Sequence, residues 1–136
     1  MDLFKTFHTD KAKEQDGAWF VLDETSKLRI ARMNNPRYHA AIQKKTQRYK
    51  IAAKMKTIPE DVWEDLVNEV IAETILVDWE GITEKGEPLL YSVENAKRML
   101  TEYPDFRNTI VLSISGEMDN FKQELDETTE KNSVRP

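Results

Sequence analysis

The sequence predicts a mainly helical α+β domain, in which four helices follow an N-terminal β-hairpin. Three observations predict this class: an apolar stripe of helical period over residues 57–78, two short β-prone segments near the start, and capping residues before the other helical segments. The 136 residues are 39% apolar, which suits one domain with its own core and is too little for two. We expect a flexible arm at 1–16, a single domain over 17–125 and a disordered tail at 126–136.

The β-hairpin is predicted from two apolar segments, AWFVLD at residues 18–23 and LRIARM at residues 28–33. Both are rich in residues that favour strands, and the polar residues 24–27 lie between them. A two-stranded hairpin alone is marginal in water, so this one is expected to lie on the helices or to pair with another chain.

A basic helix is predicted over residues 36–56. Asn35 is suited to the N-cap and Pro36 to the first helical position, where its missing N–H costs nothing. The helix has a narrow apolar stripe, which predicts partial burial, formed by Tyr38, Ile42, Tyr49 and Ala53.

An acidic amphipathic helix is predicted over Thr57–Asp78. Thr57 and Glu60 have the spacing of a capping box, and Pro59 fits the first turn. The apolar stripe of this helix is broad and needs a partner, and we expect Trp63 within it to be a core residue. The stripe consists of Val62, Trp63, Leu66, Val67, Val70, Ile71, Ile75 and Leu76.

These two neighbouring segments have opposite charge. Residues 37–56 contain seven Lys or Arg and no acid, whereas residues 57–80 contain eight Asp or Glu and no Lys or Arg. The formal net charge of only −5 conceals this contrast. The simplest arrangement is two antiparallel helices whose fields attract.

The remaining chain predicts a loop and two more helices. Residues 78–91 contain two glycines and a proline, as expected for a structured loop or a short extended segment. Ser92 is expected to cap a third helix, Val93–Tyr103, which Pro104 ends. Asp105 is expected to cap a fourth helix, although the segment TIVLSIS within it would also suit a strand.

No catalytic, cofactor or metal site is predicted. The chain has no cysteine and only two histidines, His8 and His39, neither of them in a recognisable motif. Its carboxylates are numerous rather than set in contrasting surroundings, and its four glycines form no phosphate-binding loop. Without an apolar segment of membrane-spanning length or a signal peptide, we expect a soluble intracellular protein that does not enter a membrane.

Residues 76–110 contain a series of short motifs after the acidic helix: a W-x-G loop, a short proline-containing stretch and a helix that ends in Y-P-D. The residues that form them are Trp79, Gly81, Pro88, Tyr91, Tyr103, Pro104 and Asp105. This series resembles the tail assembly chaperones of long-tailed bacteriophages and prophages, in which an acidic helix leads to the same motifs in the same order. The upstream hairpin that ends in NNP and precedes a basic helix is similar too, so the resemblance covers roughly residues 18–115.

The resemblance implies a protein without enzymatic activity. Such a chaperone binds the long helical tape measure protein, keeps it soluble and helps recruit tail tube subunits. It would act in the host cytoplasm and be absent from the mature virion. Family members are often made in two lengths through a translational frameshift.

Three groups of residues are candidate partner-binding sites, because opposite charges guide assembly. Trp79, at the end of the acidic helix, is expected either to cover the core or to contact a partner. An unpaired hairpin edge would also allow self-association. The candidates are Glu64, Asp65 and Glu69 on the acidic helix, Asp78, Trp79 and Gly81 in the loop, and Lys44, Lys45 and Arg48 on the basic helix.

Three other functions remain open. The main alternative is a small nucleic-acid-binding regulator that uses the basic helix 36–56, although the adjacent acidic segment would repel phosphates within a Debye length of about 10 Å. A small enzyme would need an isolated carboxylate in a pocket. A structural virion component would remain in purified particles.

Overall fold

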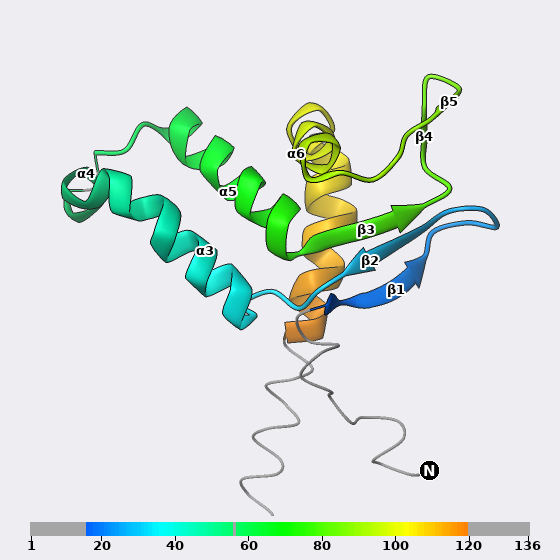
Figure 1. The fold of residues 1–136 in the computed structure, drawn as a ribbon, viewed down its shortest axis with the longest axis horizontal. Coiled ribbons are helices and arrows are strands. Elements are labelled where there is room, and N and C mark those ends of the chain that lie inside the picture. The colour runs from blue at the N-terminus through cyan, green and yellow to red at the C-terminus, as the bar shows by residue number, and fades with distance from the viewer. Residues whose placement is uncertain (1–15, 56, 120–136) are drawn as a thin grey trace, which may run out of the picture.

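The computed structural model describes residues 16–55 and 57–119, and these form a mainly helical α+β fold, as predicted. The flexible arm expected at 1–16, apart from Asp16, and the tail expected at 126–136 lie outside the described residues. Figure 1 shows a small sheet with helices beside it and a pair of antiparallel helices that extends from one end of the sheet. We call this pair, from α3 to α5, the helical projection.

The sheet has three antiparallel strands in the order β1-β2-β3: Ala18–Val21, Lys27–Ile30 and Leu76–Glu80. The first two form the predicted hairpin. In its turn, Asp23 Oδ1 accepts the backbone N–H groups of Thr25 and Ser26, at 2.9 and 2.7 Å.

The third strand corrects the expectation that Thr57–Asp78 is helical throughout. Helix α5 covers Glu60–Thr74, and the chain then enters β3, where Leu76 pairs with Ile30 and Trp79 with Leu28. The segment ILVDW is rich in β-branched and aromatic residues, which favour a strand when a partner strand is available. The hairpin therefore gains its third strand from the end of the acidic segment.

The basic segment is less regular than predicted. Helix α3 covers Pro36–Thr46, a 3₁₀ turn η1 covers Gln47–Tyr49, and α4 covers Lys50–Lys54. Asn35 is the N-cap of α3, as expected, and its side chain accepts the Tyr38 N–H at 3.0 Å. The predicted capping box at Thr57 is wrong. The Thr57 N–H instead donates to the carbonyl of Ala52 at 2.8 Å, a bond that belongs to the end of the preceding helix.

In the second half of the described chain, the elements agree more closely with those predicted from the sequence. The expected excursion is a small hairpin of β4, Thr83–Glu84, and β5, Glu87–Pro88. Helix α6, Val93–Glu102, has the predicted Ser92 cap. A further helix, residues 104–119, follows and contains one π-helical segment, η2, Phe106–Val111. Asp105 lies inside this C-terminal helix without a side-chain cap, which corrects its expected role.

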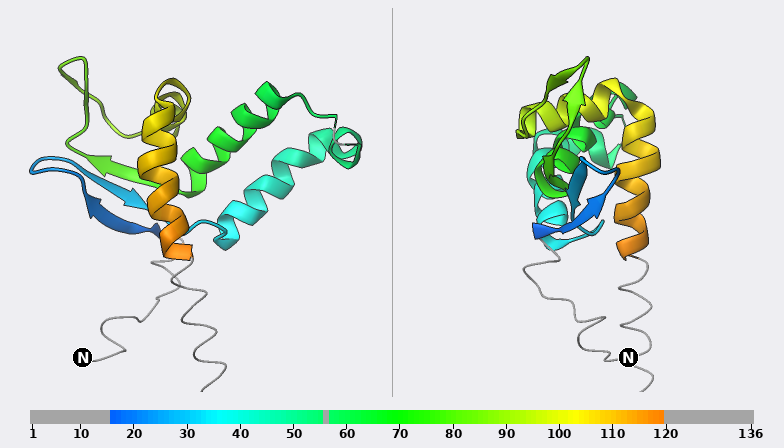
Figure 2. Two further views of the ribbon diagram at one scale, coloured as in Figure 1. Left: turned by 180° about the vertical axis from the view of Figure 1, so that it is seen from behind. Right: turned by 90° about the vertical axis from the view of Figure 1, so that its right-hand side faces the viewer.

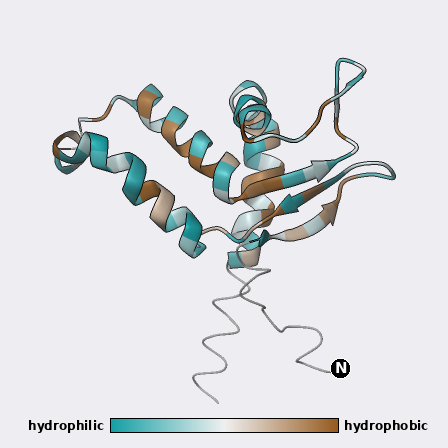
Figure 3. Cartoon of the chain, viewed as in Figure 1, coloured by the Kyte–Doolittle hydropathy of each residue, from teal (hydrophilic) through white to brown (hydrophobic). Residues whose placement is uncertain are grey.

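The core lies where the sheet meets α5, α6 and the C-terminal helix. Figure 2 shows the C-terminal helix against one face of the sheet, while no described helix covers the other face. Hydrophobic residues are concentrated on α5 and at the start of β3 (Figure 3). The core cluster consists of Leu28, Ile30, Ile71, Ala72, Ile75, Leu76, Trp79, Ala96, Met99, Leu100 and Val111.

Asn35 connects the sheet to both helices of the projection. It is fully buried, and besides capping α3 it donates its side-chain N–H groups to the carbonyls of Arg32, at 2.7 Å, and Thr74, at 3.2 Å. One amide thus satisfies the start of α3 and the end of α5. Nearby, Ser115 Oγ donates to the carbonyl of Ala31 at 2.9 Å, which attaches the C-terminal helix to the same junction.

We expect Asn35→Asp to destabilise the fold by about 3 kcal/mol, because the carboxylate keeps the cap but faces two carbonyl oxygens without a donor. Chemical denaturation measures the difference. The control is Ser92→Asp at the more exposed N-cap of α6, where a cap acceptor is all that is needed and the change should be nearly neutral. Equal effects of the two substitutions would contradict this role for Asn35.

Candidate binding surface

Ion pairs connect α5 to α3 on one side and to α6 on the other. Lys45 of α3 contacts Glu69 at 2.9 Å and Glu73 at 3.0 Å. Lys97 of α6 contacts Asp65 at 3.2 Å and Glu69 at 3.6 Å. The expectation of two antiparallel helices with attracting charges is thus confirmed, and α6 adds a cation that the sequence pattern did not reveal.

The pair of Lys45 and Glu69 is the centre of this network. The hydrogen bond from Lys45 lowers the pKa of Glu69, and the same bond raises the pKa of Lys45. Burial acts in the opposite direction on both groups but is the smaller influence. Both side chains are therefore charged at neutral pH and contact each other.

This network changes the interpretation of the acidic face. Two of its three candidate residues, Asp65 and Glu69, bind lysines of the same chain, while Glu64 is exposed and forms no ion pair within the described residues. Lys45 is likewise occupied, whereas Lys44 and Arg48 are exposed. The acidic helix is largely an internal partner of the basic one.

The candidate loop residues are structural. Trp79 is only 4% exposed, and its indole N–H donates to the carbonyl of Leu89 at 2.7 Å, so it is a core residue and no surface contact. Gly81 has φ 74°, and an added Cβ would lie 1.8 Å from the carbonyl oxygen of Thr25. Asp78 accepts the Trp79 N–H at 2.8 Å. These positions fix the turn after β3.

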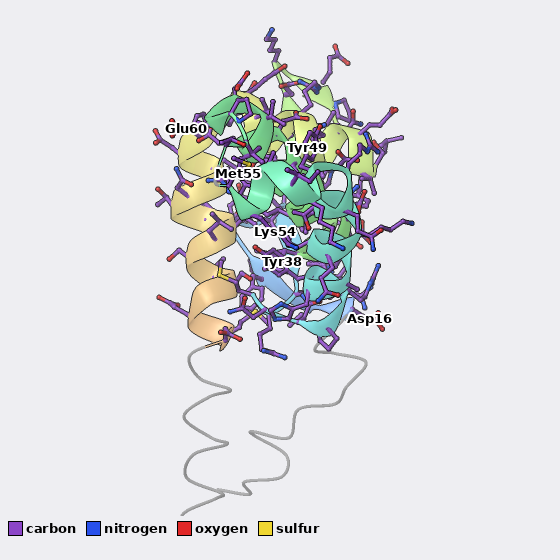
Figure 4. All side chains as sticks on the ribbon, turned by 90° about the vertical axis from the view of Figure 1, so that its left-hand side faces the viewer. Asp16, Tyr38, Tyr49, Lys54, Met55 and Glu60 are labelled. Carbon is purple, nitrogen blue, oxygen red and sulfur yellow. The ribbon has the colours of Figure 1, made fainter. Side chains whose placement is uncertain are left out.

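The outer end of the projection instead exposes three large apolar side chains, which we call the tip: Ile51, Met55 and Trp63. They are 76%, 68% and 41% exposed, so Trp63 is not the core residue expected. Figure 4 views the projection from this end, where Met55 lies near Lys54 and Tyr49.

Exposed charged side chains lie beside the tip on the same elements, acidic ones (Glu60, Asp61 and Glu64) next to Trp63 and basic ones next to Ile51 and Met55. Arg48, Lys50 and Lys54 are exposed and form no ion pair within the described residues. Behind the tip, a small hollow of about 130 Å³ is lined by Lys45, Arg48, Tyr49, Val62, Asp65, Leu66 and Glu69. The sequence did contain a signal: Ile51 and Met55 are four residues apart and lie off the stripe that contains Tyr49 and Ala53.

At the other end of the molecule, Glu84 attaches the β4–β5 hairpin to α6. Its carboxylate accepts hydrogen bonds from Arg98, at 2.8 and 3.0 Å, and from the hydroxyl of Tyr103 at 2.7 Å. The Arg98 guanidinium, aided by Tyr103, lowers the pKa of Glu84 to about 2. Such a carboxylate stays ionised and accepts no proton in the neutral range, which suits a structural contact.

Within residues 16–55 and 57–119, no group of three or more His, Cys, Asp or Glu side chains could hold a metal ion. None of the helices in this part of the chain has the length and apolar character to cross a membrane.

A family model described as YdaY prophage protein matches residues 33–132, well over half of the chain. The matched region begins just before α3 and includes the helical projection and the described part of the C-terminal helix, but not β1 and β2. Comparisons with curated proteins and with solved structures gave no match.

We expect Glu69→Gln to lower the free energy of unfolding by about 0.5–1 kcal/mol at low salt, since the pair is partly exposed and screened by water. The loss should shrink as salt is added. Because the pKa of Glu69 is lowered in the folded state, its contribution exists above its unfolded pKa and disappears on acidification. Glu64→Gln on the same helix is the control, and an equal loss there would contradict the role of the network.

We expect Glu84→Gln to flatten the dependence of stability on pH in the acid range. The pKa of Glu84 in the folded state, about 2, lies below its ordinary value of 4.5, so this carboxylate stabilises the fold above about pH 4.5 and loses that effect as the pH falls toward 2. Thermal unfolding at several pH values measures the slope. Glu87→Gln, in the same hairpin and without an ion pair in the described chain, should leave the slope unchanged.

Proposed function

Because the chain belongs to the YdaY prophage protein family, we propose that it is a prophage tail assembly chaperone without enzymatic activity. In this role it binds the tape measure protein, keeps it soluble and helps recruit tail tube protein. It acts in the host cytoplasm and leaves before the virion is complete. The sequence resemblance at residues 76–110 suggests this specific role, and the family membership supplies its prophage setting.

The observation that carries the proposal is the tip of the helical projection. Exposed large apolar side chains at the end of a projecting element mark binding sites for other proteins. Ile51 and Met55 lie one helical turn apart, which suits the apolar ridge of a partner helix. Methionine adapts its shape to varied partners, a useful property for a chaperone of a long client.

The charge around the tip favours one side of such a partner. Arg48, Lys50 and Lys54 flank Ile51 and Met55, whereas Glu60 and Glu64 lie beside Trp63, so a client helix with acidic residues on the side that meets Ile51 and Met55 is complementary. This moves the proposed contact from the acidic face of α5 to the outer end of the projection, because the Asp65 and Glu69 carboxylates already bind lysines.

A binding role also agrees with the ionisable groups of the described residues. Each carboxylate whose pKa is lowered has a hydrogen-bond partner that accounts for the shift: Lys45 for Glu69, Arg98 for Glu84, and turn backbone groups for Asp23. A general acid or base would need the opposite shift, a carboxyl group whose pKa is raised toward neutral pH by burial.

The alternative is a nucleic-acid-binding role, in which the exposed cations Arg48, Lys50 and Lys54 contact phosphates. It predicts binding that weakens steeply with salt, because phosphate contacts release counterions. It also predicts dependence on Arg48, Lys50 and Lys54, with little dependence on Ile51 or Met55. The two proposals therefore make opposite predictions for charge and for apolar variants.

To test the chaperone proposal, the protein is co-expressed with the tape measure protein of the same prophage and co-purified. We expect the double variant Ile51→Gln/Met55→Gln to lower the affinity at least tenfold, since two apolar side chains lose their burial at the contact. Glutamine keeps the helix propensity and adds no charge.

The matched control is Leu90→Gln, because Leu90 is 81% exposed and lies far along the chain, beyond β5. It should leave the affinity unchanged. Failure of the unaltered protein to retain the tape measure protein would overturn the proposal. Binding to duplex or single-stranded DNA that disappears with salt would favour the alternative.

A further inference from the structure

Strand β1 is an edge strand without the features that normally prevent edge pairing. Within the described residues it pairs only with β2, on one side. Its sequence AWFV contains no charge and no proline, the residues that commonly block an exposed edge. Trp19 and Val21 are also exposed, at 39% and 76%.

The backbone of this edge is available for hydrogen bonding at alternate residues. Leu22 donates its N–H to the carbonyl of Ser26, in register with the ladder that pairs Phe20 with Leu28. In an antiparallel ladder such pairs alternate, so Ala18 and Phe20 face β2. The N–H and C=O groups of Trp19 and Val21 therefore point to the open side.

The opposite edge of the sheet shows what a protected edge looks like. On β3, the outward N–H of Trp79 donates to Asp78 Oδ1 at 2.8 Å. The hydroxyl of Tyr91 donates to the carbonyl of Leu76 at 2.9 Å. A bulge between the pairs of Arg29 and Ile30 further disturbs this edge. Within the described residues, no comparable hydrogen bond or bulge protects the open edge of β1, so the two edges differ.

We infer that β1 pairs antiparallel with β1 of a second copy, forming a continuous six-stranded sheet around a two-fold axis at Phe20. In this register Trp19 of each copy faces Val21 of the other, and these are the residues with outward backbone groups. Two hydrogen-bonded pairs form, each exchanging both N–H···O bonds. The interface is isologous, as two-fold symmetry requires.

The side chains and charges of this register are compatible. Trp19 opposite Val21 is an aromatic and β-branched pair, a favourable combination across strands. Lys27 Nζ lies 4.5 Å from the centre of the Trp19 ring. This cation–π contact holds the ring in position before a second copy binds. The cations of β2 in the two copies are three strand spacings apart, about 14 Å, beyond the Debye length of about 8–10 Å.

A second copy fits this edge better than an unrelated strand, because the segment AWFV is complementary to an antiparallel copy of itself. The same four residues provide the hydrogen bonds, the cross-strand pair and the absence of like charges on both sides. The surface is separate from the tip at Ile51, Met55 and Trp63. If β1 does not pair with a second copy, the proposed function at the tip is unaffected. If the tip does not bind the tape measure protein, the inferred pairing of β1 is unaffected.

Charge substitutions test the inference through the molar mass in solution. The unaltered chain should be a concentration-dependent dimer of twice 15.9 kDa in sedimentation or light scattering over the micromolar range. The variant Trp19→Glu/Val21→Glu should be monomeric, since acids oppose acids across the axis. Its own fold should persist, because the new acids lie beside Arg29 and Lys27 of β2.

The compensating variant Trp19→Glu/Val21→Lys should recover the dimer, because each Glu then faces a Lys of the partner; the single variant Val21→Lys, which sets a lysine opposite Lys27 of its own chain, is the control for the fold. Circular dichroism checks that both variants are folded. A monomeric unaltered chain, or a Glu/Glu variant that still dimerises, would overturn the inference. Equal behaviour of the Glu/Glu and Glu/Lys variants would overturn the register.

Cysteine substitutions test the register directly, since the chain has no cysteine of its own. At the axis, Phe20→Cys places two thiols in a non-hydrogen-bonded pair, with Cα atoms about 4.5 Å apart, within reach of a disulfide. Val21→Cys is more exposed but lies offset from its symmetry mate. Mild oxidation should cross-link the first variant at least tenfold faster. Faster cross-linking of Val21→Cys would indicate random collision and contradict the pairing.

Discussion

The structure depends on the pairing of β2 with β3, which brings together residues on either side of the helical projection. Ile30 pairs with Leu76, and the N–H of Ala31 donates to the carbonyl of Ile75 at 2.8 Å. Everything between these residues must leave the sheet and return to the same place. An outgoing helix and a returning helix satisfy this constraint, and buried Asn35 satisfies polar groups of both where they meet the sheet.

The charge contrast between these helices then has a structural use. An element that leaves the body has fewer neighbours to bury its surface, so additional contacts between its two helices are needed. Lys45 provides such a contact between α3 and α5, and Lys97 attaches the other side of α5 to α6. These ion pairs involve Asp65, Glu69 and Glu73 of α5. At the outer end of the projection, Arg48, Lys50 and Lys54 form no ion pair within the described residues and lie beside Ile51 and Met55.

Local signals in the sequence predicted the parts of the fold that are locally determined. The Asn35 and Ser92 caps, the first hairpin and the attraction of the charged helices all depend on residues close in sequence or on net charge. The boundary between α5 and β3 does not. Ile75 and Leu76 continue the helical stripe, and only their contact with Ile30, far away in sequence, makes a strand the better conformation.

The tryptophans show the same limit for the candidate site. An amphipathic pattern indicates which side of a helix is apolar but not how far the neighbouring elements extend along it. Trp63 is near the outer end of α5, past the body, and is therefore exposed, while Trp79 is in β3 over the core. The apolar stripe thus predicted a buried Trp63, and only the positions of the surrounding elements show that it is exposed.

The two inferred surfaces gain meaning from their positions. The projection leaves one end of the strands, and β1 forms the sheet edge (Figure 1). Antiparallel pairing at that edge reverses the second copy, so its projection extends from the opposite end of the joined sheet. A dimer would present two tips facing away from each other. On a long helical client with repeated apolar ridges, this arrangement favours binding at two separated segments, and the effective concentration of the second tip raises the overall affinity without a new kind of contact.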